Sequence, residues 1–206
     1  MVKSNLGVFV KIKDMNTFKS LEEIYSRVWE KLEEAVASRH EPWRTASVAT
    51  VRNNHPELRS MVLRGVDSSR KIIWFHTDLR SPKCNDLRLN SQGAVLFHDN
   101  PDHIQLRLNG LFEFDSSSKQ SDEVWKTLLP SPRRCYQGPF VPGSESPVMS
   151  SNIPETPEPL PVGRENFARL ILSITQMDCL VLKAKGHIRA RWLFTKNGVE
   201  ATWLNP

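Results

Sequence analysis

The sequence predicts a mainly β protein, an antiparallel barrel of about eight strands with flanking helices. Strand-like apolar segments follow one another closely between residues 46 and 114. Short turns separate most of them, whereas parallel strands would need regular crossover helices. The pair Asn197-Gly198 between two further strand-like runs is typical of a type I′ hairpin turn. At 206 residues the chain fits a single domain over residues 1–206.

The individual elements follow from hydrophobic periodicity and turn residues. The expected strands are residues 46–51, 61–66, 71–77, 94–98, 104–114, 179–182, 187–196 and 199–204. The expected helices are residues 17–38, 81–89, 120–129 and 163–175. In the first helix apolar residues recur on one face and Thr17 is the expected capping residue. Residues 163–175 are interpreted as helical because Phe167, Leu170, Ile171 and Ile174 recur at helical spacing.

Proline is concentrated in one segment. Nine of the 14 prolines lie between residues 130 and 161. Because proline cannot donate a backbone hydrogen bond, this segment is expected to be a long loop rather than part of the sheet. A mobile surface loop and a functional lid are both compatible with this composition.

Composition narrows the class of protein. The net charge is +5 and the pI about 9.2, but the cations are scattered and form no polybasic arm, so nucleic acid is not an expected partner. No apolar run approaches a membrane span, and the run at residues 6–10 is too short for a secretory signal. A cytoplasmic protein is expected. Cys84, Cys135 and Cys179 share no paired spacing, which predicts free thiols and no metal site.

The common catalytic motifs are absent. The sequence contains no G-x-S-x-G, G-x-x-x-x-G-K-[ST], G-x-G-x-x-G or H-E-x-x-H. Polar residues instead cluster at strand ends in three blocks, residues 59–64, 74–83 and 105–110. In the second block a strand runs into a helix start, where Ser81, Lys83 and free backbone N–H groups make a good phosphate cradle.

The order of these blocks resembles a known family. Arg-x-x-Val-Leu-Arg at residues 59–64 is followed by Phe-His-Thr-Asp-x-x-Ser-x-Lys at 75–83 and Gln-x-Arg-x-x-Gly at 105–110. This order resembles the FMN-binding core of the pyridoxamine phosphate oxidase-like flavoproteins, and the likeness extends from about residue 17 to the end. The resemblance implies an FMN-binding split β-barrel and a homodimer with FMN at the subunit interface.

The resemblance also implies roles for individual residues. Arg59 and Lys83 match the ligands of the FMN phosphate, with the Ser81 hydroxyl beside them. The other implied cofactor-binding residues are Met61, Val62, Leu63, Arg64, His76, Thr77, Gln105 and Arg191. Candidate substrate-binding residues are Arg133, Arg134, His187 and Arg189. No catalytic residue is assigned.

Four features depart from the family pattern. Pro82 stands where the family has a second cation, and His187-Ile188-Arg189 stands where it has Arg-x-His. The flavin-stacking tryptophan is absent, with Val181 near its place, and the Tyr and Ser that bind the substrate phosphate are not evident around residues 130–136. We expect an FMN-dependent oxidoreductase related to pyridoxamine 5'-phosphate oxidase that acts on a small molecule. The alternatives are a non-catalytic flavin- or haem-binding sensor and a basic nucleic-acid binder.

Overall fold

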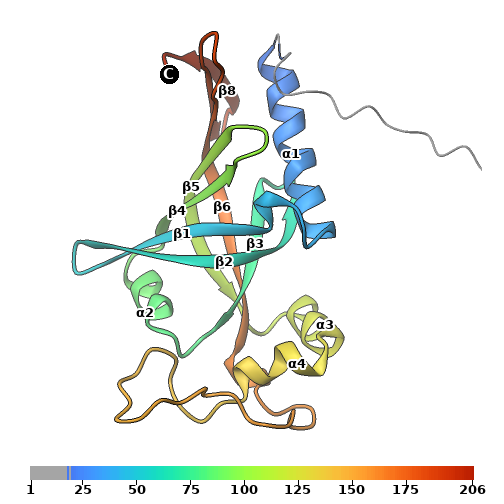
Figure 1. Ribbon diagram of the computed structural model, residues 1–206, viewed down its shortest axis with the longest axis vertical. Coiled ribbons are helices and arrows are strands. Elements are labelled where there is room, and N and C mark those ends of the chain that lie inside the picture. Colours follow the sequence, from blue (N-terminus) through green and yellow to red (C-terminus); the bar gives the residue numbers. More distant parts are fainter. Residues whose placement is uncertain (1–17, 19) are drawn as a thin grey trace, which may run out of the picture.

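A closed antiparallel barrel is the centre of the molecule. The structure is a computed structural model that describes residue 18 and residues 20–206; the run at residues 6–10 and Thr17 lie outside the described residues. Eight strands form one sheet in the order β3-β2-β1-β4-β5-β6-β7-β8. An additional pairing of β3 with β6 closes six strands into a barrel, and β7 and β8 extend beyond it (Figure 1). The predicted split β-barrel with flanking helices is confirmed.

All eight expected strands are present. They are β1 Thr45–Arg52, β2 His55–Asp67, β3 Ile72–Asp78, β4 Gln92–Asp99, β5 Ile104–Asp115, β6 Phe167–Val181, β7 Ile188–Thr195 and β8 Gly198–Leu204. The helical elements are α1 Leu21–Ala37, η2 Pro42–Arg44, α2 Pro82–Leu89, α3 Lys119–Thr127, α4 Pro130–Arg133, η3 Arg134–Tyr136 and η4 Arg164–Asn166. No helix among the described residues is long and apolar enough to cross a membrane.

Helix α1 packs its apolar face onto the barrel core. The hydroxyl of Ser20 caps the helix by accepting a hydrogen bond from the Glu23 N–H at 3.2 Å. Ile24, Val28 and Leu32, spaced one helical turn apart, are at most 1% exposed and join the main hydrophobic core. The helix therefore covers the barrel interior.

The prediction of a helix over residues 163–175 is wrong. Only the turn η4 is helical there, and residue 167 begins β6, the longest strand of the sheet. The first six residues of β6 are all buried because the strand pairs with β3 and β5 and side chains from α3 and η3 cover its outer side. A strand buried on both faces is apolar at most positions, here at all of the first six except Arg169, so its sequence does not alternate and also fits a helix.

The terminal hairpin lacks the predicted type I′ turn, and the hairpin between β1 and β2 has one. Thr195 pairs with Gly198, and the positive φ falls on Gly198 alone, at 127°, so the expectation of a type I′ turn at Asn197-Gly198 is wrong although the hairpin is present. Asn53 and Asn54 between β1 and β2 have φ values of 49° and 63°. Positive φ at both central residues is the type I′ geometry, and asparagine tolerates it well.

The proline-rich segment begins as the short helices α4 and η3 and continues as an irregular loop. Side chains fix its backbone at both ends: the Arg134 Nε donates to the Pro154 carbonyl at 2.6 Å, and the Gln137 Nε2 donates to the Glu158 and Val162 carbonyls at 3.0 Å. Arg80 Nη1 also donates to the Gly138 carbonyl at 2.8 Å. The loop thus attaches to the end of the barrel that carries α2 (Figure 1).

Gly110 is required where β5 passes β6. The register shifts between Asn109 and Gly110, and a Cβ added at Gly110 would lie 2.1 Å from the Ser173 carbonyl oxygen. Since backbone must then move, we expect Gly110→Ala to lower the free energy of unfolding by about 1–3 kcal/mol. Urea unfolding followed by circular dichroism measures it. Asn109→Ala on the same strand is the control, and equal stability of the two variants would contradict the assignment.

Candidate cofactor site

Arg59 faces the barrel interior at the end where α2 lies. It pairs directly with Val48, which is fully buried, so both side chains point to the inner side of the sheet. Its Nη1 donates to the Val48 carbonyl at 3.2 Å and to the Thr50 hydroxyl at 2.8 Å. Thr50 is 1% exposed, so this hydroxyl holds the guanidinium in one position.

Ser81 and Lys83 meet at the start of α2. Ser81 occupies the N-cap position but makes no capping hydrogen bond; its hydroxyl donates to the Asp78 carbonyl at 2.7 Å and accepts from the Lys83 Nζ at 2.7 Å. The Thr77 hydroxyl lies 3.7 Å from the Cys84 Sγ in the same turn. Ser81 therefore orients the lysine instead of capping the helix.

Arg59 and Lys83 lie within electrostatic range of each other. Burial lowers the pKa of Lys83, and the positive charge of Arg59 lowers it further, against the opposing effects of Cys84 and Asp78. Burial also lowers the pKa of Arg59. Within the described part of the chain neither cation forms an ion pair with a carboxylate. Two cations without a counter-ion, beside two hydroxyls, fit a phosphate dianion. We call Thr50, Arg59, Thr77, Ser81 and Lys83 the phosphate end.

A second group surrounds His76 on the outer side of β3. The ring of His76 packs edge-on against Phe167, with centroids 5.0 Å apart. Burial lowers the pKa of His76 to about 3, and the positive charges of Arg64, Arg169 and Arg44 lower it further. The imidazole is therefore neutral at physiological pH and presents one donor and one acceptor.

The third group lies on the outer face of β5, β6 and β7, where Arg107, Asp178 and Arg191 are directly paired across the three strands. Asp178 is buried and accepts hydrogen bonds from Arg107 Nη2 at 2.8 Å and from Arg189 at 3.0 Å (Nη2) and 3.1 Å (Nε). The Nε of Arg191 is buried without a partner in the described structure. Gln105, two residues before Arg107, points to the same face. Three arginines thus surround one carboxylate, and two of them, Arg107 and Arg189, donate hydrogen bonds to it.

The barrel wall separates these groups. Arg59 points inward, whereas Gln105 alternates with the buried Ile104 and Leu106 and points outward. Met61 and Leu63 belong to the core, so only their backbone is open to a ligand, while Val62 is 36% exposed on the outer side. The structure therefore brings the predicted phosphate ligands together and places Gln105 and Arg191 elsewhere in the same chain.

The candidate substrate residues are also dispersed. Arg133 has a buried Nε and Nη1 without a hydrogen-bond partner in the described structure, whereas Arg134 is used to hold the loop. His187 Nδ1 accepts from the Lys183 N–H at 3.1 Å, and Arg189 binds Asp178. The described residues contain no cluster of three or more histidine, cysteine or acidic side chains placed to hold a metal.

Several polar residues of these groups were not predicted. Arg107 stands in the Gln-x-Arg-x-x-Gly block, but its role was not assigned. The others, listed by group, are Thr50, Arg52 and Asp86 near the phosphate end, Arg44 and Arg169 around His76, and Asp178 on the outer face. Strand pairing and the packing of α1, α2 and α3 against the barrel create their contacts, and no local pattern in the sequence indicates them.

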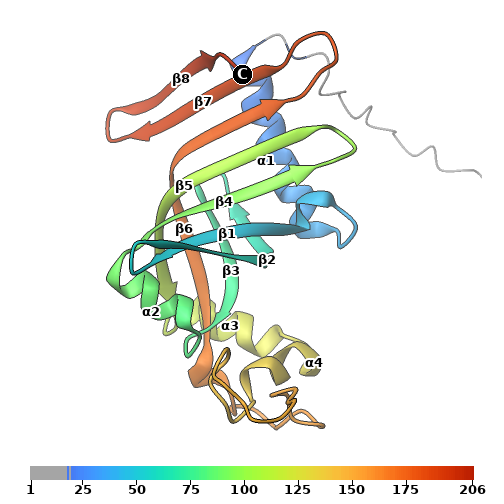
Figure 2. The same ribbon diagram turned by 60° about the vertical axis from the view of Figure 1, so that its left-hand side comes forward.

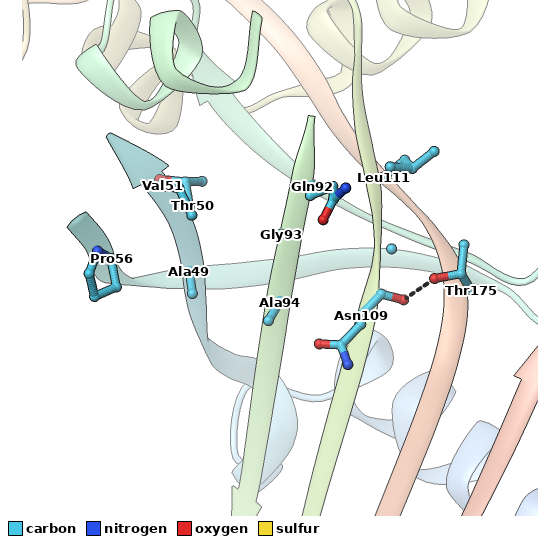
Figure 3. A pocket seen from close by; sticks show the side chains of 11 residues that line it. Ala49, Thr50, Val51, Pro56, Gln92, Gly93, Ala94, Asn109, Leu111 and Thr175 are labelled. Carbon is cyan, nitrogen blue, oxygen red and sulfur yellow. Dashed lines mark hydrogen bonds between the residues drawn. The ribbon is translucent and has the colours of Figure 1, made fainter. Parts of the chain in front are cut away.

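The outer face of β1, β4 and β5 carries a shallow groove. Its volume is about 610 Å³, and Val51, Ala94 and Leu111 are among its lining residues (Figure 3). Thr175 donates to the Asn109 carbonyl at 3.2 Å at its edge. Among the described residues no helix crosses this face, and α1 lies behind it (Figure 2). The groove is continuous with a smaller one that reaches Leu58, Gln105 and Arg107.

A closed six-stranded antiparallel barrel with a cationic phosphate end is characteristic of the FMN-binding split-barrel proteins. Residues 26–115 match the family model described as "Pyridoxamine 5'-phosphate oxidase, FMN-binding domain". The match covers less than half of the chain, and it supports FMN as the cofactor. The matched range includes the phosphate end, His76 and Gln105 but not Asp178 or Arg191.

Two relatives agree with this assignment. A pyridoxine/pyridoxamine 5'-phosphate oxidase of Pelagibacter ubique is 30% identical over 88 residues, which are 43% of this chain and 41% of that protein. The pyridoxine/pyridoxamine 5'-phosphate oxidase 2 of Arabidopsis thaliana is 27% identical over 162 residues, which are 74% of this chain and 80% of that protein. The match to the Pelagibacter protein thus spans less than half of its length.

Solved structures show the same fold. A pyridoxamine 5'-phosphate oxidase-related, FMN-binding protein of Nostoc punctiforme superposes with a TM-score of 0.70 at 23% identity. The superposition covers 91% of this chain and 100% of that chain. At this identity the likeness establishes the barrel and its order of strands.

His76 makes stability depend on pH. Its pKa is about 3 in the folded chain and about 6.5 when unfolded, so below pH 6.5 the unfolded state binds more protons. The stability from neutral His76 is present above pH 6.5 and is lost as pH falls towards 3. We expect His76→Phe to lose less free energy of unfolding between pH 7 and pH 4 than the parent, measured by urea titrations.

The control for this experiment is His40→Gln, since His40 lies in solvent after α1. The control should keep the parent slope of stability against pH. A His76→Phe slope as steep as that of the parent would show that other groups cause the acid destabilisation.

Proposed function

We propose that this chain is an FMN-dependent oxidoreductase acting on an anionic small molecule. The observation that carries the proposal is the phosphate end, where Arg59 and Lys83 come together without a carboxylate partner in the described structure. FMN ends in a phosphate dianion, and charge-assisted hydrogen bonds from these residue types suit it. The family match over residues 26–115 supports the same cofactor.

The roles of the phosphate end follow from its contacts. FMN, when bound, supplies the hydride chemistry, and the protein supplies binding and orientation. Arg59 and Lys83 bind the phosphate, and Thr50 and Ser81 hold these two cations in position. The backbone of β2 at residues 61–64 lies beside the flavin in this proposal, because the side chains of Met61 and Leu63 are committed to the core.

Cations outside the phosphate end support an anionic substrate. Arg64 raises the positive potential at His76 and Tyr136, and within the described residues it forms no ion pair. On the outer face, Arg189 and Arg191 exceed the charge that Asp178 alone can neutralise. A carboxylate or phosphate on the substrate would compensate either group.

The residues at the substrate positions differ from those expected for pyridoxamine phosphate. Val181, near the place of the flavin-stacking tryptophan, is 1% exposed and belongs to the core. Residues 187–189 read His-Ile-Arg instead of Arg-x-His, and Arg189 is already engaged by Asp178. The proposed substrate is therefore a different anionic small molecule.

A homodimer is the second part of the proposal. Leu58, Leu111 and Val51 are 68%, 48% and 38% exposed on the outer face of the sheet, where no helix covers them. Exposed apolar surface of this kind marks an interaction site. A second copy seated there would bring its own Gln105 and Arg191 towards the phosphate end of the first, which unites residues that the barrel wall separates within one chain.

Cofactor binding tests the first part. Purified protein, alone or after addition of FMN, should show the two-band absorbance of oxidised flavin. We expect Arg59→Ala and Lys83→Ala each to raise the Kd for FMN about tenfold to a hundredfold, because a hydrogen bond to a charged group contributes about 1.5–3 kcal/mol. Quenching of flavin fluorescence gives the Kd. Arg88→Ala on the solvent side of α2 is the control and should retain the parent Kd.

Absence of flavin absorbance in the parent after FMN addition would refute the proposal. Turnover separates an enzyme from a non-catalytic flavin- or haem-binding sensor. Anaerobic stopped-flow mixing with NAD(P)H and with candidate amines should reduce the bound flavin if the protein is an oxidoreductase. Tight binding without reduction by any donor would favour the sensor.

The dimer is tested by charge on the outer face. Leu58→Arg and Leu111→Arg should convert the dimer to a monomer, because an unpaired cation would be buried at the interface. Light scattering after gel filtration measures the mass, and the monomer should bind FMN more weakly than the parent. Leu89→Arg is the control, since Leu89 is 90% exposed on α2. A monomeric parent protein would contradict this part of the proposal.

A further inference from the structure

We propose that Arg52 is a third cation for the FMN phosphate and that Asp86 holds it in place. The inference rests on the proposed function. Pro82 occupies the first position of α2, so this helix start carries one cation, Lys83, where the family pattern has two. Arg52 comes from the end of β1, a different element, and nothing in its sequence context marks it as a ligand.

Strand pairing directs Arg52 towards the phosphate end. Every second residue of a strand lies on the same face, so Val48, Thr50 and Arg52 share one face of β1. Val48 and Thr50 are buried on the inner side. Arg59 pairs with Val48 across the hairpin and extends towards Thr50, the residue between Val48 and Arg52 on that face. The guanidinium of Arg59 therefore points along the strand in the direction of Arg52.

Asp86 fixes the orientation of Arg52. This carboxylate is 5% exposed on α2, one helical turn after Lys83, and it accepts from the Arg52 Nε at 2.9 Å and Nη2 at 3.0 Å. A two-bond pair of this geometry restricts the planar guanidinium to one position. The remaining nitrogen, Nη1, lies 3.6 Å from the Glu57 Oε1, which is an ion pair but too long for a hydrogen bond. A phosphate oxygen would accept the hydrogen bonds of this nitrogen in place of the longer contact with Glu57.

The charges of these residues reach one another. Burial lowers the pKa of Arg59; Glu57 and Asp86 oppose this effect, and the positive charge of Arg52 adds to it. Arg59 in turn lowers the pKa of Lys83. Arg59 from β2 thus lies within electrostatic range of Arg52 from β1 and of Lys83 from α2. A phosphate dianion placed beside Arg59 would reduce both repulsions.

A comparison of FMN with riboflavin tests this inference, because riboflavin lacks only the phosphate. We expect Arg52→Ala to raise the Kd for FMN about tenfold, which corresponds to the loss of one charge-assisted hydrogen bond. The Kd for riboflavin should stay unchanged. Asp86→Asn should shift the FMN Kd in the same direction by a smaller factor, because Arg52 remains but loses its charged partner. Arg88→Ala again serves as the control on α2.

Each outcome is decisive. If Arg52→Ala raises the Kd for FMN and for riboflavin equally, Arg52 only joins β1 to α2 and the inference is wrong. An unchanged Kd for FMN also overturns it. A parent protein that binds no FMN rejects the proposed function itself, which is a different result from a normal parent with an insensitive variant. Arg52→Gln, which keeps a hydrogen-bonding side chain, replaces Arg52→Ala if circular dichroism shows that the alanine variant is unfolded.

Discussion

The pairing of β3 with β6 is the constraint on which the rest of the structure depends. Seven residue pairs, from Ile72 with Ser173 to Asp78 with Phe167, join strands that are almost 100 residues apart in sequence and close the sheet. Closure satisfies the edge of β3 and encloses the core. It also fixes Asp78, from which the turn into α2 starts, at one end of the barrel. Ser81 and Lys83 are positioned through that turn.

The closed wall gives the chain two chemically different faces. Side chains of the inner face form the core, and at the barrel end Arg59 with Thr50 is a polar group on that side. The groove on the outer face of β1, β4 and β5 is lined in part by apolar residues, and no described helix covers it. Strands β5–β7 add a cluster of arginines around Asp178. The proposed homodimer would let one cofactor contact residues of both faces, because the two groups would then come from different copies.

The buried carboxylates of Asp178 and Asp86 each accept hydrogen bonds from arginine side chains. Asp178 accepts from two arginines, and Asp86 accepts from Arg52 in a two-bond arrangement. Such carboxylates are costly to bury unless they are paired and hydrogen-bonded. Their burial close to candidate ligand-binding cations indicates that they orient those cations. By contrast Lys31 with Asp99 and Asp102 ties α1 to the turn after β4, far from the phosphate end.

Alternation, turn residues and helix starts by themselves determined the strands β1–β5, the terminal hairpin and α1–α3, because these signals are local. The grouping of Arg59, Ser81 and Lys83 as phosphate ligands came from the resemblance to the flavoprotein family and stays a prediction. Only the tertiary structure decided that residues 167–175 are a strand, since burial on both faces removes the alternation that distinguishes strand from helix. It also decided that Arg52 meets Asp86, that Arg107 meets Asp178, and which predicted ligands share a face. These contacts depend on pairing between distant segments, and a local sequence pattern contains no information on that pairing.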